Sequence, residues 1–465
     1  MNKTKIVCSI GPTSSDVKTL ERMIDAGMNV ARFNMSHGTH ESHKALIDAV
    51  KQARANKNKP VAIMIDTKGP EIRVKQFENG KIILKDNDTF TLTTNEVTGN
   101  QDCVSVTYKS LPKILKKGTK ILLNDGNIEL KVDKLSAHDI ICTVVHGGEL
   151  SNNKSINIPG VKTDMPYLSE QDKSDLLFAK EMNADYIAIS FVNCADDVMQ
   201  VKKYLREINF KDVKIISKIE SEESVNNYDK ILKVSDGIMV ARGDLGVEID
   251  FVRIPILQKQ FIAKCNFYGK IVITATQMLE SMITHSRPTR AEISDVANAI
   301  LDGTTAIMLS GETASGQFPV EAVETMKRIA IETENYTEGC RSNIITHDDS
   351  ESLGYAVYAL SQTENIKGIV VVTKSGATAE NISRFRPDTP IIACTPNEKV
   401  YNKMSLLYGV LPLLDKTYTS MDEINSSSLK KALETKLVKK NEKVVLVSGL
   451  VAGKSGSNLM VIKKL

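Results

Sequence analysis

Lys218 and Glu220 are the residues of this sequence whose types and spacing most directly suggest chemistry. They end the stretch 213–220, in which three isoleucines form a β-branched run that predicts a buried strand. Residues two apart on a strand point to the same side, so an ammonium group and a carboxylate would leave the strand together. A cation for a phosphoryl group and an anion for its metal suit phosphoryl transfer. The alternative is a strand end with one solvated salt bridge.

The composition is typical of a soluble globular protein. The 465 residues predict about two to four domains, and 42% of them are hydrophobic and 25% charged. The net charge of +3 is spread out, and no apolar run approaches the roughly 18 residues of a membrane span. We therefore expect neither a nucleic-acid partner nor a membrane partner.

The cysteines and the N-terminus predict a cytoplasmic protein. Seven cysteines are scattered without paired spacing, which indicates reduced thiols and neither a disulfide framework nor a zinc site. Residues 1–10 have too short an apolar core for a signal peptide and lead directly into a predicted strand.

Short apolar strands alternate with amphipathic helices in the first part of the chain. The predicted order is strand Lys5–Ile10, helix Ser15–Ala26, strand Met28–Phe33, helix Thr39–Asn56 and strand Val61–Asp66. Such alternation favours a parallel sheet.

Region 70–165 interrupts this alternation. Its segments are short and separated by turns such as Asn79-Gly80, which predicts an all-β domain inserted into one strand-to-helix connection. The strands predicted there are Lys81–Leu84, Thr89–Thr93, Lys120–Leu123, Ile128–Val132 and Ile140–Val145.

The alternation resumes after the insertion and brings the total to eight strands, each followed by a helix. Residues 1–69 and 166–336 therefore predict a (β/α)₈ barrel. An open doubly wound sheet would carry Gly-x-Gly-x-x-Gly in its first turn, and this sequence does not. Residues 337–465 predict a separate α/β domain, with loops at 426–428 and 436–443.

Polar residues gather where the barrel strands end, which is where (β/α)₈ barrels hold their active sites. Six strand ends carry such groups, whereas the opposite ends look plainer, as at Asn29 and Asp185. The six ends include Arg32, Asn34, Ser36 and His37; Asp66, Thr67 and Lys68; Lys218 and Glu220; Arg242, Gly243 and Asp244; Thr274 and Thr276; and Ser310, Glu312 and Thr313.

The types of these groups indicate cation and anion binding. Glu220 and Asp244 are hard oxygen ligands suited to Mg²⁺ or Mn²⁺. The predicted turn Gly243–Gly246 could bring backbone N–H groups to a substrate anion. Arg32 and Arg73 add to the positive charge of Lys218.

A mostly neutral oxygen cluster with one negative charge suits a monovalent cation better than a second magnesium. It consists of Asn34, Ser36, Asp66 and Thr67. Simpler interpretations exist for single residues: Arg242 as a structural ion pair and His37 as a turn residue.

The sequence resembles the pyruvate kinase family over essentially its whole length. The resemblance rests on the segments 4–12, 29–38, 66–73, 216–220, 241–246, 274–281, 287–292 and 308–314, which include Asn29-Val-Ala-Arg-Phe-Asn-Met-Ser-His-Gly38 and Ile216-Ser-Lys-Ile-Glu220. It implies transfer of a phosphoryl group from phosphoenolpyruvate to ADP, giving pyruvate and ATP in glycolysis.

The resemblance also implies roles for the matching residues. Lys218 would stabilise the moving phosphoryl group and Arg32 would bind the phosphate. Gly243, Asp244 and Thr276 would surround the substrate carboxylate, and the Thr276 region would help to protonate the enolate. The matching metal ligands are Glu220 and Asp244 for Mg²⁺, and Asn34, Ser36, Asp66 and Thr67 for K⁺.

The inserted domain would then act as a lid over the mouth of the barrel. The nucleotide contacts implied by the resemblance are Asn34, His37, Arg73 and Lys154, the last from the lid. Glu71 resembles the potassium-dependent members, because independent members tend to carry lysine there. The resemblance further suggests a homotetramer.

The loop 373–378 follows a predicted strand and precedes a predicted helix. Its hydroxyl and N–H groups could form a phosphate site, and in similar proteins this loop binds a sugar-phosphate activator. The residues concerned are Thr373, Lys374, Ser375, Gly376 and Thr378. An ordinary strand–helix turn is the alternative.

The sequence departs from the family pattern in two places. Phe33 and Met35 replace leucine and phenylalanine, and both remain apolar. Segment 448–456 lacks the tryptophan- and arginine-bearing loop that clamps a bisphosphate in animal forms, so it does not identify the effector.

Two other functions fit parts of the pattern. A magnesium-dependent barrel lyase or aldolase acting on phosphoenolpyruvate or oxaloacetate would use the same carboxylates but would not need Lys218 or ADP. A catalytically idle sensor of sugar phosphates would use loop 373–378, but we would expect it to have lost Lys218, Glu220 or Asp244, and all three are present.

Overall fold

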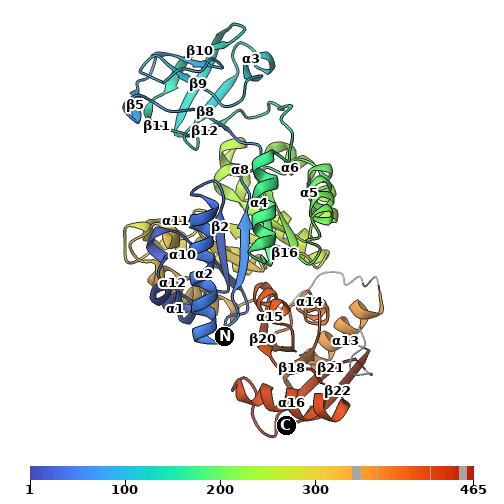
Figure 1. Ribbon diagram of the computed structural model, residues 1–465. Helices are drawn as coiled ribbons and strands as arrows, with labels where there is room; N and C mark the ends of the chain where they lie inside the picture. The colour runs from blue at the N-terminus through green and yellow to red at the C-terminus, as the bar shows by residue number, and fades with distance from the viewer. Residues whose placement is uncertain (338–345, 347, 364, 419, 450–457) are drawn as a thin grey trace.

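The chain folds into three parts, a β-rich part, a barrel and an α/β part, which follow one another from top to bottom in Figure 1. The structure is a computed structural model and describes residues 1–337, 346, 348–363, 365–418, 420–449 and 458–465. This arrangement confirms the predicted fold class: a (β/α)₈ barrel with an inserted all-β domain and a C-terminal α/β domain.

The barrel consists of parallel strands closed in the order β1-β17-β16-β15-β14-β13-β3-β2. β3 and β13 pair directly although the whole inserted domain lies between them in the sequence. The strands are β1 Lys5–Ser9, β2 Val30–Asn34, β3 Ala62–Asp66, β13 Tyr186–Ile189, β14 Lys214–Ile219, β15 Gly237–Ala241, β16 Ile271–Ala275 and β17 Ala306–Leu309.

Helices surround the barrel, and several begin at a side chain that accepts a hydrogen bond from the third helical residue. Asp16, Thr39, Ser169 and Thr289 act in this way. The elements are η1 Pro12–Ser14, α1 Val17–Ala26, α2 His40–Lys57, α4 Glu170–Glu181, α5 Ala195–Glu207, α6 Glu222–Asn226, α7 Tyr228–Val234, α8 Arg242–Glu248, η2 Phe251–Arg253, α9 Ile254–Phe267, η3 Glu280–Ile283, α10 Arg290–Leu301, α11 Gly311–Ala314 and α12 Pro319–Glu334.

The two faces of β14 separate the helix-facing core from the barrel interior. Ile215 and Ile219 belong to the hydrophobic cluster that includes the barrel helices, whereas Ile216 belongs to the cluster inside the barrel. Because side chains alternate along a strand, Lys218 and Glu220 share the inward side with Ile216. The strand therefore brings both groups to the mouth of the barrel.

The inserted domain, called the lid below, has its own hydrophobic core. Its first and last strands, β4 and β12, pair with each other, so the two ends of the lid lie side by side. The elements are β4 Ile72–Arg73, β5 Lys81–Leu84, β6 Thr89–Thr93, β7 Cys103–Ser105, α3 Leu111–Ile114, β8 Lys120–Leu123, β9 Ile128–Leu135, β10 Asp139–His146, β11 Gly148–Ser151 and β12 Ser155–Asn157.

The C-terminal part is a five-stranded sheet in the order β20-β19-β18-β21-β22, with only β22 antiparallel to its neighbour. Its elements are α13 Asp349–Thr363, β18 Ile366–Val372, α14 Ala377–Ser383, β19 Ile391–Thr395, α15 Glu398–Lys403, η4 Met404–Leu406, β20 Val410–Leu414, α16 Met421–Glu434, β21 Lys443–Ser448 and β22 Leu459–Lys464.

The loop predicted at Ser426–Ser428 is wrong, because these residues lie inside α16. The helix tolerates the three serines because Ser426 Oγ donates to the carbonyl oxygen of Asp422 at 2.8 Å and Ser428 donates to that of Ile424. Ser420 supplies the helix cap.

The C-terminal part packs against the bottom of the barrel. One hydrophobic cluster contains both the inward residues of the barrel strands and residues of the C-terminal sheet and helices. Lys5 Nζ donates to the carbonyl oxygen of Val410 at 2.7 Å, and Tyr186 Oη donates to that of Lys403 at 2.8 Å. In the described ranges no helix has the length and apolarity needed to cross a membrane, and the six described cysteines are free.

The bottom of the barrel contains a buried charged residue, Asp185, although the sequence suggested few functional groups there. The buried Asp185 carboxylate accepts a hydrogen bond from Ile63 N at 2.9 Å. Burial raises the pKa of Asp185 from 3.8 to about 6, although this hydrogen bond and nearby positive charges act in the opposite direction. The folded protein thus holds this proton more tightly than the unfolded chain does.

We expect Asp185→Asn to increase stability at pH 7.5 and to increase it less at pH 5. Because the folded-state pKa is raised, the stability that protonation contributes is lost as the pH rises from about 4 to about 6. An amide avoids this penalty, which is on the order of 3 kcal/mol at most for a shift of this size. Urea unfolding at the two pH values measures the effect.

Asp236→Asn is the matched control, because Asp236 Oδ2 accepts a hydrogen bond from Ile215 N at 2.9 Å but its side chain is 32% exposed. An equal gain for both variants, or a gain for Asp185→Asn that does not depend on pH, would contradict the prediction.

Candidate active site

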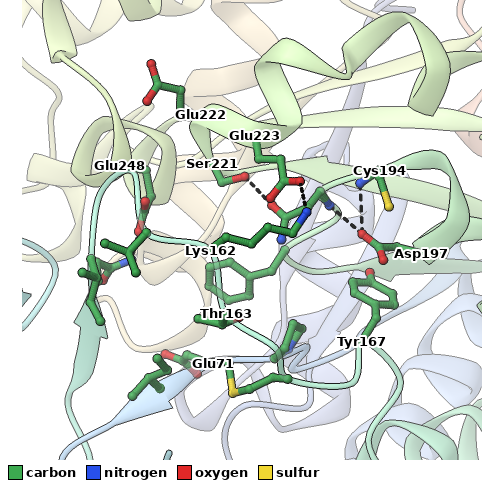
Figure 2. A pocket seen from close by; sticks show the side chains of 18 of the residues that line it. Glu71, Lys162, Thr163, Tyr167, Cys194, Asp197, Ser221, Glu222, Glu223 and Glu248 are labelled. Atoms are coloured by element: carbon green, nitrogen blue, oxygen red, sulfur yellow. Dashed lines mark hydrogen bonds and ion pairs between the residues drawn. The ribbon is translucent and has the colours of Figure 1, made fainter. Parts of the chain in front are cut away.

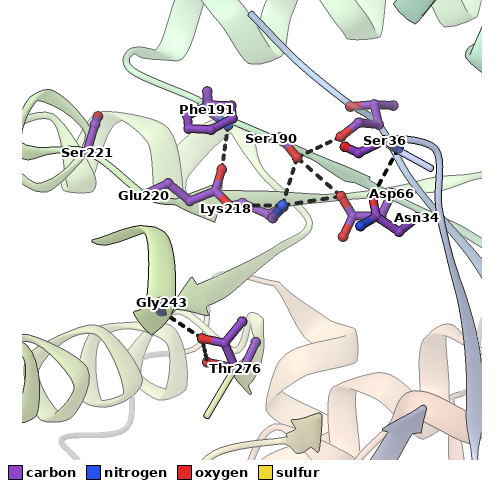
Figure 3. A network of polar contacts seen from close by, with 12 residues as sticks. Asn34, Ser36, Asp66, Ser190, Phe191, Lys218, Glu220, Ser221, Gly243 and Thr276 are labelled. Atoms are coloured by element: carbon purple, nitrogen blue, oxygen red, sulfur yellow. Dashed lines mark hydrogen bonds and ion pairs between the residues drawn. The ribbon is translucent and has the colours of Figure 1, made fainter. Parts of the chain in front are cut away.

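Lys218 lies at the mouth of the barrel and contacts three oxygen atoms (Figure 3). Its Nζ is 2.8 Å from Ser190 Oγ, 2.8 Å from Glu220 Oε1 and 3.3 Å from Asp66 Oδ1. Burial alone would lower the pKa of Lys218, but the negative charges of Asp66, Glu220 and Asp244 outweigh burial and raise the pKa. The structure thus holds a fully charged ammonium group in a buried position.

Glu220 is a buried carboxylate that pairs with Lys218 and has one oxygen outside hydrogen-bonding geometry. Phe191 N donates to Oε2 at 2.7 Å, whereas Oε1 has no partner in hydrogen-bonding geometry despite its short distance from Lys218. Burial raises the pKa of Glu220; the Lys218 charge opposes this rise, and the Asp244 charge adds to it. A cation between the two carboxylates would relieve their repulsion.

These two carboxylates fit a divalent cation that also binds substrate oxygens. Mg²⁺ usually takes one or two carboxylates and completes its shell with water and phosphate. Within the described residues no cluster of three or more His, Cys, Asp and Glu side chains could hold a metal by itself.

The predicted turn at Gly243–Gly246 is wrong, because these residues belong to the short helix α8. Glycine is needed at position 246 for packing, because an added Cβ would lie 2.9 Å from Ile254 Cδ1. The N–H group of Gly243 donates to Thr276 Oγ1 at 2.7 Å (Figure 3). The helix brings Asp244 to the mouth in its first turn.

Thr276 has a backbone conformation that β-branched residues rarely adopt. Its φ is 69°, and the next residue, Gln277, has a φ of 53°. The Arg242 guanidinium holds this segment by donating to the carbonyl oxygens of Thr276 at 2.7 Å and Gln277 at 3.2 Å, and it pairs with Asp295 at 2.7 Å. Arg242 thus has the structural ion pair that the sequence suggested.

Arg32 and Asp66 form the second half of the mouth. Arg32 Nε is 2.6 Å from Asp66 Oδ2, and Arg32 Nη1 donates to Ser9 Oγ at 2.7 Å. Burial would raise the pKa of Asp66, but the charges of Arg32 and Lys218 outweigh it and lower the pKa. Asp66 therefore carries its negative charge at neutral pH.

The four residues of the predicted monovalent-cation site lie together at the ends of β2 and β3. Asn34 Oδ1 accepts from Ser36 N at 3.1 Å, and Figure 3 shows both residues beside Asp66. Thr67 follows directly, and its carbonyl oxygen accepts from Ser190 Oγ at 2.7 Å. Amide, hydroxyl and carbonyl oxygens around one carboxylate fit an ion of low charge.

Two of the residues predicted to contact a nucleotide, Arg73 and Lys154, belong to the lid, whereas Asn34 and His37 lie at the end of β2 and just after it. Arg73 pairs with Glu71 Oε2 at 2.7 Å and donates to the carbonyl oxygen of Asn153 at 2.8 Å. Partial burial, and then the positive charges of Arg73, Arg32 and Lys154, lower the pKa of His37. The structure thus places these cations within electrostatic reach of His37.

A cleft of about 560 Å³ lies beside the mouth, between the lid connections and the barrel (Figure 2). Its lining includes Glu71, Tyr167, Phe191 and Glu223, and Lys162 reaches across it to Glu223 with a distance of 2.8 Å between Nζ and Oε1. The cleft is lined by neither Lys218 nor Asp244, so it adjoins the chemical groups without containing them.

Loop 373–378 lies in the C-terminal part, away from the mouth. Gly376 N donates to Thr373 Oγ1 at 3.0 Å and Ala377 N donates to Ser375 Oγ at 3.4 Å, so the loop's own hydroxyl groups engage two of its N–H groups. Most of the divergent segment 448–456 lies outside the described residues.

The sequence interpretation missed Ser9, Ser190 and the N–H group of Phe191. Ser190 comes directly after β13, whereas the sequence predicts a strand over Tyr186–Phe191 that encloses it. Active-site residues of such barrels lie just after the strands. A predicted strand that ended two residues earlier would therefore have identified Ser190 as a candidate.

The family model "Pyruvate kinase, barrel domain" matches residues 1–323, and "Pyruvate kinase, alpha/beta domain" matches residues 351–463. A pyruvate kinase of Sporosarcina psychrophila is 47% identical over 99% of this chain and 80% of the relative, and one of Geobacillus stearothermophilus is 46% identical over the same shares. A pyruvate kinase of Clostridium perfringens is 44% identical over 100% of both chains. The chain therefore belongs to the pyruvate kinase family.

Proposed function

We propose that the mouth of the barrel transfers the phosphoryl group of phosphoenolpyruvate to ADP, giving pyruvate and ATP in glycolysis. The observation that carries this proposal is the buried, charged Lys218 on the same inward face as Glu220. Membership in the pyruvate kinase family supports the reaction itself, which makes the protein a phosphotransferase.

Lys218 and Arg32 bind the phosphoryl group in this proposal. Both are held by Asp66, which lies between them, at 3.3 Å from Lys218 Nζ and 2.6 Å from Arg32 Nε. Their fixed positions stabilise charge on the phosphoryl oxygens without reorganisation during transfer.

Glu220 and Asp244 would hold Mg²⁺ or Mn²⁺, which when bound supplies positive charge to the anionic substrates. Asn34, Ser36, Asp66 and Thr67 would hold K⁺. Glu220 Oε1, which pairs with Lys218 but has no partner in hydrogen-bonding geometry, and the mixed oxygen donors at the ends of β2 and β3 support these assignments.

Gly243, Asp244 and Thr276 would surround the substrate carboxylate, and the Thr276 region would supply the proton to the methylene carbon of the enolate. The Thr276 hydroxyl has a fixed direction because it donates to the carbonyl oxygen of Ala275 at 2.6 Å and accepts from Gly243 N at 2.7 Å. These contacts fix the position of the hydroxyl oxygen beside Gly243, and delivery of a proton to the methylene carbon would require the O–H to turn away from the Ala275 carbonyl oxygen.

The lid would close over the mouth and exclude water, with Arg73 and Lys154 approaching ADP together with Asn34 and His37. We also propose a cytoplasmic homotetramer in which a sugar phosphate binds loop 373–378, at Thr373, Lys374, Ser375, Gly376 and Thr378. The strand–loop–helix geometry of that loop supports this site.

The test of the reaction is pyruvate formation from phosphoenolpyruvate and ADP with Mg²⁺. We expect turnover that depends on ADP. Consumption of phosphoenolpyruvate without ADP would instead favour a lyase, and the absence of turnover with a panel of sugar phosphates present would favour a sensor.

Replacing K⁺ with tetramethylammonium is expected to abolish most of the turnover. Tetramethylammonium keeps the ionic strength but is too large to be coordinated by the Asn34, Ser36, Asp66 and Thr67 oxygens. Titration of KCl into the assay should restore activity with saturation. Equal rates in both buffers would contradict the K⁺ site and the significance of Glu71, but not the enzyme activity.

A further inference from the structure

Ser190 and Phe191 form the corner at which β13 ends, and this corner contacts both Lys218 and Glu220 (Figure 3). Ser190 Oγ accepts from Lys218 Nζ at 2.8 Å, and Phe191 N donates to Glu220 Oε2 at 2.7 Å. Two successive residues thus orient the two groups on which the proposed chemistry depends.

The Ser190 hydroxyl has one proton and three polar neighbours. Thr67 O lies at 2.7 Å and Asp66 Oδ1 at 3.2 Å, so the hydroxyl donates to the closer carbonyl oxygen and keeps its lone pairs for Lys218. Ser190 is 3% exposed, which leaves little access for competing water. A neutral acceptor fixes the direction of the ammonium group without neutralising its charge.

Phe191 supports this corner with an uncommon backbone conformation. Its φ is 53°, which non-glycine residues adopt mainly where surrounding contacts enforce it. The chain turns away from the direction of β13 at this residue, and the Phe191 N–H donates to Glu220.

The carbonyl oxygen of Ser190 contacts both chain connections between barrel and lid. Tyr167, in the returning connection, donates from Oη to Ser190 O at 2.9 Å. Gly69, in the outgoing connection, has a φ of 69° and passes so close that an added Cβ would lie 2.8 Å from Ser190 O. Asp172 joins the two connections because it accepts from Gly69 N at 3.0 Å and from Ser169 N at 3.1 Å.

We propose that Ser190 is a positioning residue for phosphoryl transfer. Its hydroxyl fixes the Lys218 ammonium group, and its carbonyl oxygen ties that hydroxyl to both lid connections through Tyr167 and Gly69. The inference rests on the role proposed for Lys218. It also implies that one residue, Ser190, holds both the lid connections and the Lys218 ammonium group in place.

Ser190→Ala tests the hydroxyl. We expect kcat to fall by about 10–100-fold, since a hydrogen bond to a charged group is removed where it orients the transferred group. We expect KM for phosphoenolpyruvate to change by less than about threefold, because Lys218 keeps its charge and its two carboxylate contacts. Ser190→Thr, which retains a hydroxyl, should recover most of the lost kcat.

Ser217→Ala is the matched control. Ser217 precedes Lys218 on β14, is equally buried, and bonds Ser235 Oγ at 2.7 Å on the opposite face of the strand. We expect a similar change in unfolding temperature for both alanine variants but an unchanged kcat for Ser217→Ala. Tyr167→Phe tests the carbonyl contact, with kcat expected to fall by about 3–10-fold.

Wild-type kcat in Ser190→Ala, or equal losses in the Ser190→Ala and Ser217→Ala variants, would overturn the proposal. If Ser190→Ala does not fold, Tyr167→Phe decides: wild-type kcat in that folded variant overturns the link to the lid. Lys218→Met, measured in parallel, distinguishes failure of the role proposed for Lys218 from failure of the positioning role proposed for Ser190. Full activity of Lys218→Met would refute the role of Lys218 itself.

Discussion

Replacing Lys218 with methionine is expected to lower kcat by on the order of 10²–10³, the usual cost of removing one group that stabilises charge in the transition state. Methionine matches the length and flexibility of lysine but carries no charge. The contacts with Ser190, Asp66 and Glu220 would be lost together, and Arg32 would be the one remaining member of the pair proposed to bind the phosphoryl group. Steady-state pyruvate formation measures the effect.

Lys214→Met is the matched control, because Lys214 begins the strand that Lys218 ends. Lys214 pairs with Glu380 of the C-terminal part at the far end of the barrel. A partly exposed pair of this kind contributes little, so kcat should stay within about threefold of wild type. A Lys218→Met enzyme that keeps more than about a tenth of wild-type kcat would contradict the role assigned to Lys218.

Glu220→Gln is expected to lower kcat/KM by about 10³, because a bound metal contributes several kcal/mol of charge stabilisation. Glutamine keeps the shape of the side chain and an acceptor for Phe191 N but lacks the charge that holds a divalent cation. The Mn²⁺ concentration at half-saturation should rise by at least about tenfold. Titration followed by electron paramagnetic resonance measures Mn²⁺ binding independently of turnover.

Glu222→Gln separates this effect from a general loss of negative charge near the mouth. Glu222 lies two residues further along, in α6, and its Oε1 is 3.6 Å from Arg253 at a solvent-accessible position. Its replacement should leave both Mn²⁺ affinity and turnover near wild type. Unaltered Mn²⁺ affinity in Glu220→Gln would place the metal elsewhere.

The barrel could be predicted from the sequence because its strands are short apolar runs and several of its helices begin at capping residues. The shared inward direction of Lys218 and Glu220 could also be predicted, because side chains alternate along a strand and this alternation fixes which residues face inward. The lid strands β4 and β12 could not be predicted, because two and three residues carry no periodicity. They form only because each finds a partner from the other end of the lid.

The errors near the site have local physical reasons. Gly243 and Gly246 suggested a turn, but Gly246 is small because Ile254 packs where a side chain would stand. Ser190 was missed because β13 ends at a positive φ on Phe191, and a phenylalanine gives no sequence signal for such a bend. Tertiary contacts with Glu220 and the lid connections fix that conformation.

The pairing of β4 with β12 has a consequence for how the chain folds. β3 and β13 are neighbours in the barrel, yet residues 67–185 separate them, and forming that contact first would require closing a long loop. The lid has its own core, and the pairing of β4 with β12 brings residues 72–73 next to residues 155–157, so that only the segments on either side of the lid remain to be closed. A lid that folds early thus shortens the search by which the barrel closes, so substitutions in the lid core should slow the refolding of the barrel.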